Sequence, residues 1–156
     1  MKKLKNLFKT YIYIYINNER NDNMLEKNNL IFIYGKAGNY KSSLGVSLLN
    51  STNKKACYIN LDNNHLKTND NIKVFDEVSD IGFIKKCISD YSVILVDYIE
   101  LLEINKDELL ELKELVKNEN KKLIIISCCS GNKELMNNDH YNELKEIADL
   151  MILTDR

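Results

Sequence analysis

The sequence contains no proline, no tryptophan and only five glycines among its 156 residues, and it has no apolar run near the roughly 20 residues that cross a bilayer. Its 22 basic and 23 acidic side chains leave a formal net charge of -1, so no overall basic excess indicates binding to nucleic acid or to an anionic membrane. The hydrophobic fraction of 44% is too high for a disordered chain. We therefore expect one globular domain in the cytoplasm, without a membrane partner.

The cysteines also lack the spacing of a metal site or a disulfide framework. There is no C-x-x-C and no accompanying pair of histidines, and each cysteine lies in an apolar stretch or at its end. We expect reduced cysteines in a core. Asparagine and lysine are so abundant that we expect most of them on solvated surfaces. The four cysteines are Cys57, Cys87, Cys128 and Cys129.

Residues 1–29 differ from the rest and predict an N-terminal extension. Tyrosine and isoleucine alternate over residues 11–16, which is typical of a strand with two unlike faces, and residues 17–29 form a polar segment that we expect to be loose. The short apolar stretch, without a cleavage site, does not fit a secretory signal. A strand outside the main sheet could pair with a second copy of the chain or with a protein partner. The alternatives are a strand folded back on its own domain and an ill-ordered tail.

From residue 30 onward, apolar runs alternate with helical patterns. The spacing predicts helices after Asp80, Asn105 and Asp139, and Asn105 with Glu108 resembles a capping box. Residues 72–75 form either a short extra strand or an extended connection. The alternation predicts a three-layer α/β domain over residues 30–156, with a mainly parallel sheet of five strands. These strands are expected at residues 30–34, 56–61, 92–96, 123–126 and 150–153.

The sharpest motif follows the first of these strands. Residues 35–42 read GKAGNYKS, close to the phosphate-loop pattern G-x-x-x-x-G-K-[ST], and a helical run comes next. Such a loop points its backbone N–H groups at a polyphosphate, with a lysine on the terminal phosphates and a hydroxyl on Mg²⁺. An ordinary strand-to-helix turn is the alternative. The residues predicted to bind ATP are Gly35, Lys36, Ala37, Gly38, Asn39, Tyr40, Lys41, Ser42 and Ser43, among which Lys41 is also a catalytic candidate and Ser42 a Mg²⁺ ligand.

Tyr40 departs from the pattern, because the motif has glycine at this position. A glycine lets the backbone pass close to the phosphates without a Cβ, so we expect a tyrosine to crowd the nucleotide or to distort the loop. The loop is then a degenerate one that binds ATP weakly or no longer hydrolyses it. Restoring glycine at position 40 is predicted to tighten nucleotide binding.

Two acids close predicted strands. Asp97 ends the run YSVILVD, which is the arrangement of a Walker B element, and is the expected partner of Ser42 in holding Mg²⁺. Asp62 closes the second strand and could orient or deprotonate an attacking water, since ligands of open α/β sheets gather at the carboxyl ends of strands. The alternatives are that Asp97 merely ends a strand and that Asp62 begins a turn with Asn63 and Asn64.

Residues 30–156 resemble a RecA-like ATPase core of the kind found in the motor domains of DnaB-type helicases and in the small RadB and KaiC proteins. The resemblance rests on YGKAGNYKSS, on the acid after YINL, on LVDYIELL and on EIADLMILTDR. It implies that Lys41 and Ser42 bind phosphate and Mg²⁺, that Asp97 is the Walker B acid and that Asp62 is the counterpart of the catalytic glutamate. It further implies a link to DNA replication, recombination or repair, with single-stranded DNA and further copies of the chain as partners.

Three departures weaken the resemblance to a motor. Tyr40 replaces a glycine, Asp62 is one methylene shorter than glutamate, and Cys128 stands where the family often has a glutamine. We therefore expect a slow or degenerate ATPase. Two alternatives stay open: Lys36 makes the loop similar to that of the ParA and MinD partition ATPases, and an adaptor could bind nucleotide without hydrolysis and act through protein contacts.

Overall fold

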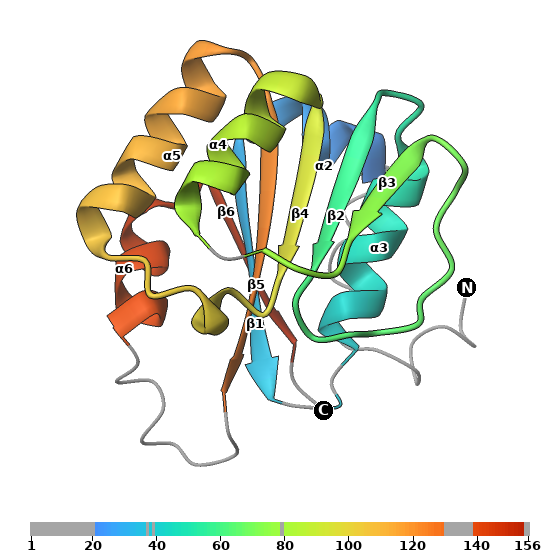
Figure 1. Cartoon of the computed structure of the whole chain (residues 1–156). Coiled ribbons are helices and arrows are strands. Elements are labelled where there is room, and N and C mark those ends of the chain that lie inside the picture. The colour runs from blue at the N-terminus through green and yellow to red at the C-terminus, as the bar shows by residue number, and fades with distance from the viewer. Residues whose placement is uncertain (1–20, 37, 39, 79, 130–138, 155–156) are drawn as a thin grey trace.

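The computed structural model describes residues 21–36, 38, 40–78, 80–129 and 139–154, which alternate between helices and strands (Figure 1). The strand predicted over residues 11–16 lies outside the described residues. In chain order the elements are α2 (Asn21–Lys27), β1 (Leu30–Lys36), α3 (Lys41–Ser51), β2 (Ala56–Asn60), β3 (Ile72–Phe75), α4 (Ile81–Asp90), β4 (Val93–Asp97), η2 (Ile99–Leu101), α5 (Lys106–Asn118), β5 (Lys122–Cys129), α6 (Asp139–Ile147) and β6 (Leu150–Thr154).

The strands form one sheet in the order β3-β2-β4-β5-β1-β6, and every neighbouring pair is parallel. The three-layer α/β prediction is confirmed, with six strands in the described sheet rather than five. The additional strand is β3, which pairs with β2 at the edge, so residues 72–75 are a strand and not a connection. Because β5 lies between β1 and β4, the segments after these three strands meet at one edge of the sheet.

The two faces of the sheet explain the near-continuous apolar runs. In β1, Leu30 and Phe32 face a core that is completed by α4, α5 and α6, whereas Ile31 and Ile33 face a second core with α2 and α3. A strand covered on both faces needs an apolar residue at nearly every position. Helix α5 begins with the predicted capping box. The Asn105 side chain accepts a hydrogen bond from the backbone N–H of Glu108, and the Glu108 side chain accepts one from the backbone N–H of Asn105.

Helix α2 corrects the interpretation of residues 17–29 as loose. Met24 and Leu25 are only 3% and 4% exposed and belong to the core under α3. A helix this short is not stable by its own propensity and depends on the packing of its apolar side chains. Two apolar residues in a polar stretch give no helical period, which is why the sequence pattern does not reveal it.

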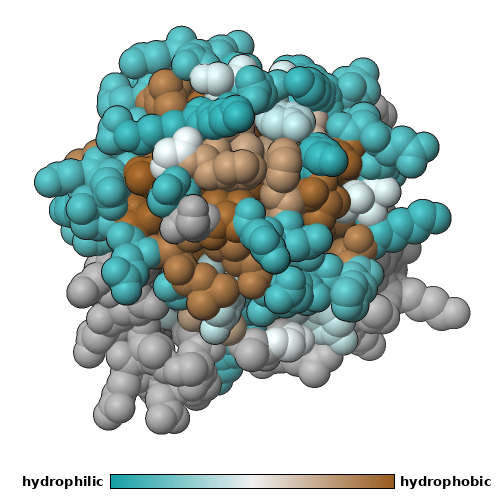
Figure 2. Space-filling view, in the orientation of Figure 1, coloured by the Kyte–Doolittle hydropathy of each residue, from teal (hydrophilic) through white to brown (hydrophobic). Residues whose placement is uncertain are grey.

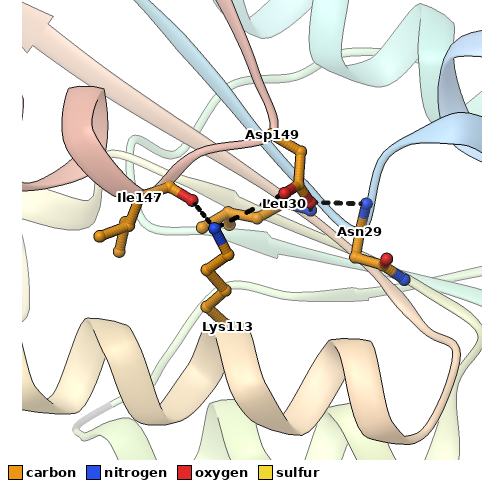
Figure 3. Close-up of polar contacts among 5 residues, drawn as sticks. All are labelled: Asn29, Leu30, Lys113, Ile147 and Asp149. Carbon is orange, nitrogen blue, oxygen red and sulfur yellow. Dashed lines mark hydrogen bonds and ion pairs between the residues drawn. The ribbon is translucent and has the colours of Figure 1, made fainter.

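The edge of the sheet where β1 begins is held together by Asp149 (Figure 3). Its carboxylate accepts hydrogen bonds from the backbone N–H groups of Asn29 at 3.0 Å and Leu30 at 2.9 Å, and lies 3.6 Å from Nζ of Lys113. Lys113 also donates to the carbonyl oxygen of Ile147. These contacts tie the start of β1 to α5 and to the turn between α6 and β6.

The face that α4 and α5 cover has hydrophobic side chains at its centre and hydrophilic ones around them (Figure 2). Exposed pairs such as Lys85 with Glu111, 2.6 Å apart, link α4 to α5 and contribute at most about 1 kcal/mol. Among the described residues, none of the helices has the length and apolar content that crossing a membrane requires.

Candidate nucleotide-binding site

The predicted phosphate loop joins β1 to α3. A Cβ on Gly35 would lie 2.0 Å from Oγ1 of Thr154, so the close packing of β1 against β6 requires glycine there. Gly38 has a φ of 76°, which favours glycine, and open space where a Cβ would be. Ala37 and Asn39 lie outside the described residues.

Tyr40 adopts the left-handed backbone conformation, with φ 60° and ψ 23°, at the position before α3. For an L-residue with a Cβ this conformation costs about 1–2 kcal/mol. The helix still begins at the next residue, because the N–H of Leu44 donates to the carbonyl oxygen of Tyr40 at 2.9 Å. Tyr40 therefore keeps the turn that glycine would make, at the cost of backbone strain. The residue is 39% exposed and lines the pocket.

Lys41 is buried in the first turn of α3, with 7% of its surface exposed. Its Nζ donates to the carbonyl oxygen of Lys36 at 2.6 Å and lies 3.7 Å from Sγ of Cys128. The first turn of α3 contains no acidic residue, so the positive end of the helix dipole is not neutralised from within the helix. Lys36, the other lysine of the loop, is exposed at the end of β1.

A pocket of about 380 Å³ opens at this edge of the sheet. Its volume is at the lower end of the range for small-molecule sites, which is roughly 300–1,000 Å³. Four separate segments reach it: the start of α3 with the loop before it, the segment after β2, the end of β4 and the second half of β5. The predicted residues that line the pocket are Gly38, Tyr40, Lys41, Ser42, Ser43, Asp62 and Asp97, and the structure adds Asn64, Tyr98 and Cys128 among others.

The close packing of α3 on the sheet brings Ser42 toward Asp97. A Cβ on Gly45 would lie 2.8 Å from the end of Ile126 and 3.0 Å from the end of Leu95, so the glycine lets the helix approach β4 and β5. As a result Ser42, in the first turn of α3, lies within hydrogen-bonding reach of Asp97 at the end of β4.

Asn64 connects the predicted residues. Its Nδ2 lies 3.0 Å from Oγ of Ser42, 3.1 Å from Oδ2 of Asp62 and 3.1 Å from Oδ2 of Asp97. The sequence assigned Asn64 only to a turn, because nothing in its spacing marks it. Its place is set by the buried Asn60, four residues earlier, whose side chain holds the backbone of Asn64.

Asp97 is almost fully buried, with 2% of its surface exposed. Burial raises the pKa of Asp97 above the usual range, while hydrogen bonds from Ser42, Tyr58 and Asn64 oppose this shift. The hydroxyl of Tyr58 lies 2.9 Å from Oδ2 of Asp97. Burial and the nearby charge of Asp97 raise the pKa of Tyr58, so the hydroxyl stays protonated and donates a hydrogen bond to the carboxylate.

The end of β5 reaches the pocket beside Lys41. Oε1 of Glu100, in η2, accepts hydrogen bonds from the hydroxyl of Ser127 and from the backbone N–H of Cys128 at 2.7 Å. Cys57 and Cys87 are buried free thiols, as expected. Cys128 is not a core residue: it is half-buried and lines the pocket, because β5 extends beyond its predicted end at residue 126.

The oxygen atoms around the pocket suit Mg²⁺. The Ser42 hydroxyl and the Asp97 carboxylate are hard oxygen ligands of the kind that this cation prefers, and the Asp62 carboxylate adds negative charge beside them. In the part of the chain that the structure describes, no three His, Cys, Asp or Glu side chains form a metal cluster. Mg²⁺ here would therefore take its remaining ligands from phosphate oxygens and water, as it commonly does.

No protein-family model and no curated protein matches this chain. A solved structure described as a DNA replication initiation factor is similar with a TM-score of 0.56 and 13% identity, over 97% of this chain and 49% of the other. A structure described as the DnaC helicase loader is similar with a TM-score of 0.49 and 17% identity, over 93% of this chain and 86% of the other. The chain thus spans about half the length of the initiation factor. At 13% identity the likeness to the initiation factor shows the fold alone, an α/β domain around a parallel sheet.

Proposed function

We propose that this protein binds ATP with Mg²⁺ in the pocket at the carboxyl edge of its sheet and hydrolyses it slowly, as a RecA-like ATPase. The observation that carries the proposal is the convergence of Lys41, Ser42, Asp62 and Asp97 on one pocket of about 380 Å³, although they come from three segments far apart in the sequence. A chance strand-to-helix turn would not bring both acids to the lysine and the hydroxyl.

Each residue has a role that its position supports. The Lys41 ammonium, which donates to the Lys36 carbonyl, exchanges that bond for phosphate oxygens, and the N-terminus of α3 faces the same anion. Ser42 and Asp97 hold Mg²⁺, which when bound offsets the charge of the phosphates. Asp62 is exposed at the mouth of the pocket and accepts the proton of the attacking water. Asp62 is one methylene shorter than glutamate, and its Oδ2 already accepts a hydrogen bond from Nδ2 of Asn64; both features support slow turnover.

The biological setting we propose is DNA replication, recombination or repair. It is supported by the resemblance of residues 30–156 to helicase motor cores and by the shared fold with a structure described as a DNA replication initiation factor. Single-stranded DNA and further copies of the chain are the proposed partners, in the cytoplasm. Phosphate release in the presence and absence of single-stranded DNA tests this setting, and we expect DNA to increase it.

Equilibrium binding of fluorescently labelled ATP with Mg²⁺ tests the nucleotide site. Lys41→Ala should weaken binding about tenfold or more, because a charge-assisted hydrogen bond is worth about 1.5–3 kcal/mol. Lys36→Ala is the matched control, since it removes a lysine from the same loop without emptying the pocket. Unchanged affinity in Lys41→Ala refutes the proposal, and an equal loss in both variants supports the partition-ATPase alternative.

Steady-state phosphate release separates the ATPase from the non-hydrolysing adaptor. We expect slow release from the wild type and at least tenfold slower release from Asp62→Asn, because general-base catalysis contributes about 100-fold or more. Asp62→Asn should still bind ATP. Tight binding of ATP without any release by the wild type would favour the adaptor.

A further inference from the structure

The amide of Asn64 occupies the centre of a three-oxygen cluster. Oγ of Ser42 and one carboxylate oxygen each of Asp62 and Asp97 lie within 3.0–3.1 Å of its Nδ2. These oxygens belong to α3, to the segment after β2 and to β4, and the amide is their common partner. An N–H group carries partial positive charge, so it offsets part of the repulsion between the two acids.

The backbone of Asn64 is fixed independently of this cluster. Its N–H donates to Oδ1 of Asn60 at 3.0 Å, and its carbonyl oxygen accepts from Nδ2 of Asn60 at 2.7 Å. Asn60 is itself 3% exposed, and its Oδ1 lies 3.1 Å from the hydroxyl of Tyr58. The Asn64 amide can therefore leave the cluster by rotating its side chain, whereas the backbone stays in place.

We propose that the Asn64 amide is an internal stand-in for the metal: it holds the Ser42 hydroxyl and both carboxylates in the metal-free protein and rotates away when Mg²⁺ is bound. The identity of the metal rests on the proposed function. Mg²⁺ needs its oxygen ligands at about 2.0–2.1 Å, and N–H hydrogens directed at the same oxygens would face the cation with like charge. Amide and cation consequently compete for one position, and the affinity for Mg²⁺ is set partly by the bonds that the amide gives up.

Competition predicts two effects of opposite sign in Asn64→Ala. Without Mg²⁺ the variant should unfold at a lower temperature than the wild type, because the two acids lose their shared donor. Its dissociation constant for Mg²⁺ should be about threefold lower or more, because no hydrogen bonds have to break before the cation binds. A purely structural asparagine would give the first effect without the second.

The experiment titrates the full chain with Mg²⁺ alone, without nucleotide, and follows the side-chain NH₂ resonances by NMR. The pair that disappears in Asn64→Ala is assigned to Asn64. We expect Mg²⁺ to shift this pair in the wild type and to bind the variant more tightly. Asn71→Ala is the matched control and should bind Mg²⁺ like the wild type, since that exposed amide donates only to the backbone carbonyls of Thr52 and Lys54, at 3.3 and 3.0 Å.

Three results would overturn the inference. Weaker Mg²⁺ binding by Asn64→Ala would make the amide a ligand of the metal and not its competitor. An Asn64 NH₂ pair that does not shift with Mg²⁺ in the wild type would also overturn the inference. This measurement is made on the wild type and needs a variant only to assign the pair. If Asn64→Ala does not fold, Asn64→Ser provides the assignment. Equal Mg²⁺ affinity in wild type and variant is the third. Failure of ATP to bind would refute the proposed function separately, because the Mg²⁺ titration contains no nucleotide.

Discussion

Replacing Tyr40 tests how the phosphate loop tolerates a side chain where its motif has glycine. Tyr40→Gly removes both the ring at the border of the pocket and the Cβ on a residue with φ 60°. Tyr40→Ala removes the ring and keeps the Cβ. The difference in stability between the two variants therefore measures the effect of the Cβ on the backbone conformation. The change from the wild type that both variants share measures the effect of the ring.

The size of the backbone effect follows from two opposing quantities. Relief of the left-handed conformation is worth about 1–2 kcal/mol, and the greater freedom of glycine in the unfolded chain costs about 0.5–1 kcal/mol. The glycine variant should thus be more stable than the alanine variant by about 0.5–1 kcal/mol. For a domain of this length that is a difference of about 1–4 °C in the midpoint of thermal unfolding.

Calorimetric unfolding of the two variants, followed by titration with ATP and Mg²⁺, provides the assay. We expect Tyr40→Gly to unfold at the higher temperature and to bind nucleotide more tightly than the wild type. An alanine variant at least as stable as the glycine variant would refute the strain argument. Nucleotide binding by Tyr40→Gly that is unchanged or weaker would refute the argument that the ring crowds the site.

Three further substitutions test the sheet and its acids. Gly35→Ala should destabilise the protein by about 1–3 kcal/mol in urea unfolding, because the new Cβ would overlap Thr154; an unchanged midpoint would contradict the packing of β1 against β6. Asp149→Ala should cost about 2 kcal/mol in the same assay, since it leaves two N–H groups at the start of β1 without their acceptor, and a loss no larger than that of Lys113→Met would show that the hydrogen bonds contribute little. Asp97→Asn should raise the thermal midpoint of the metal-free protein at neutral pH, because burial raises the pKa of Asp97 and its ionisation therefore opposes folding. The same substitution should abolish the effect of Mg²⁺ on the thermal midpoint, because it removes a proposed ligand. This gain in thermal midpoint should shrink as the pH falls through the raised pKa and vanish below the ordinary aspartate pKa, where Asp97 of the wild type is protonated in both the folded and the unfolded chain. A gain that persists at low pH would contradict the account.

The sequence predicts the strands of the sheet well, because a strand depends on local order. Burial on both faces makes β1 and β4 continuous apolar runs, and the glycine, lysine and serine of the loop must stand at fixed spacing to turn the backbone toward an anion. Asp62, in the turn after β2, and Asp97, at the end of β4, follow from the rule that parallel strands end at one edge. The structure brings both acids to the loop as this rule requires.

The polar network behind the site could not be predicted in this way. Asparagines are so frequent in the sequence that none stands out, and a solvated surface was the expectation for them. Asn60 is buried and positions Asn64. Farther along, the backbone N–H of Asn69 donates to Oδ1 of Asn50 at 2.9 Å, which ties the long segment before β3 to the end of α3. Such contacts join residues whose proximity only the folded chain determines.

Titration calorimetry of the wild type with millimolar ATP and Mg²⁺ tests the central claim most directly, with the same titration of Lys41→Ala beside it. The account predicts saturable heat from the wild type, a rise in its thermal midpoint as binding stabilises the folded state, and the loss of both in the variant. No heat and no thermal protection in the wild type would contradict the assignment of this pocket to a nucleotide.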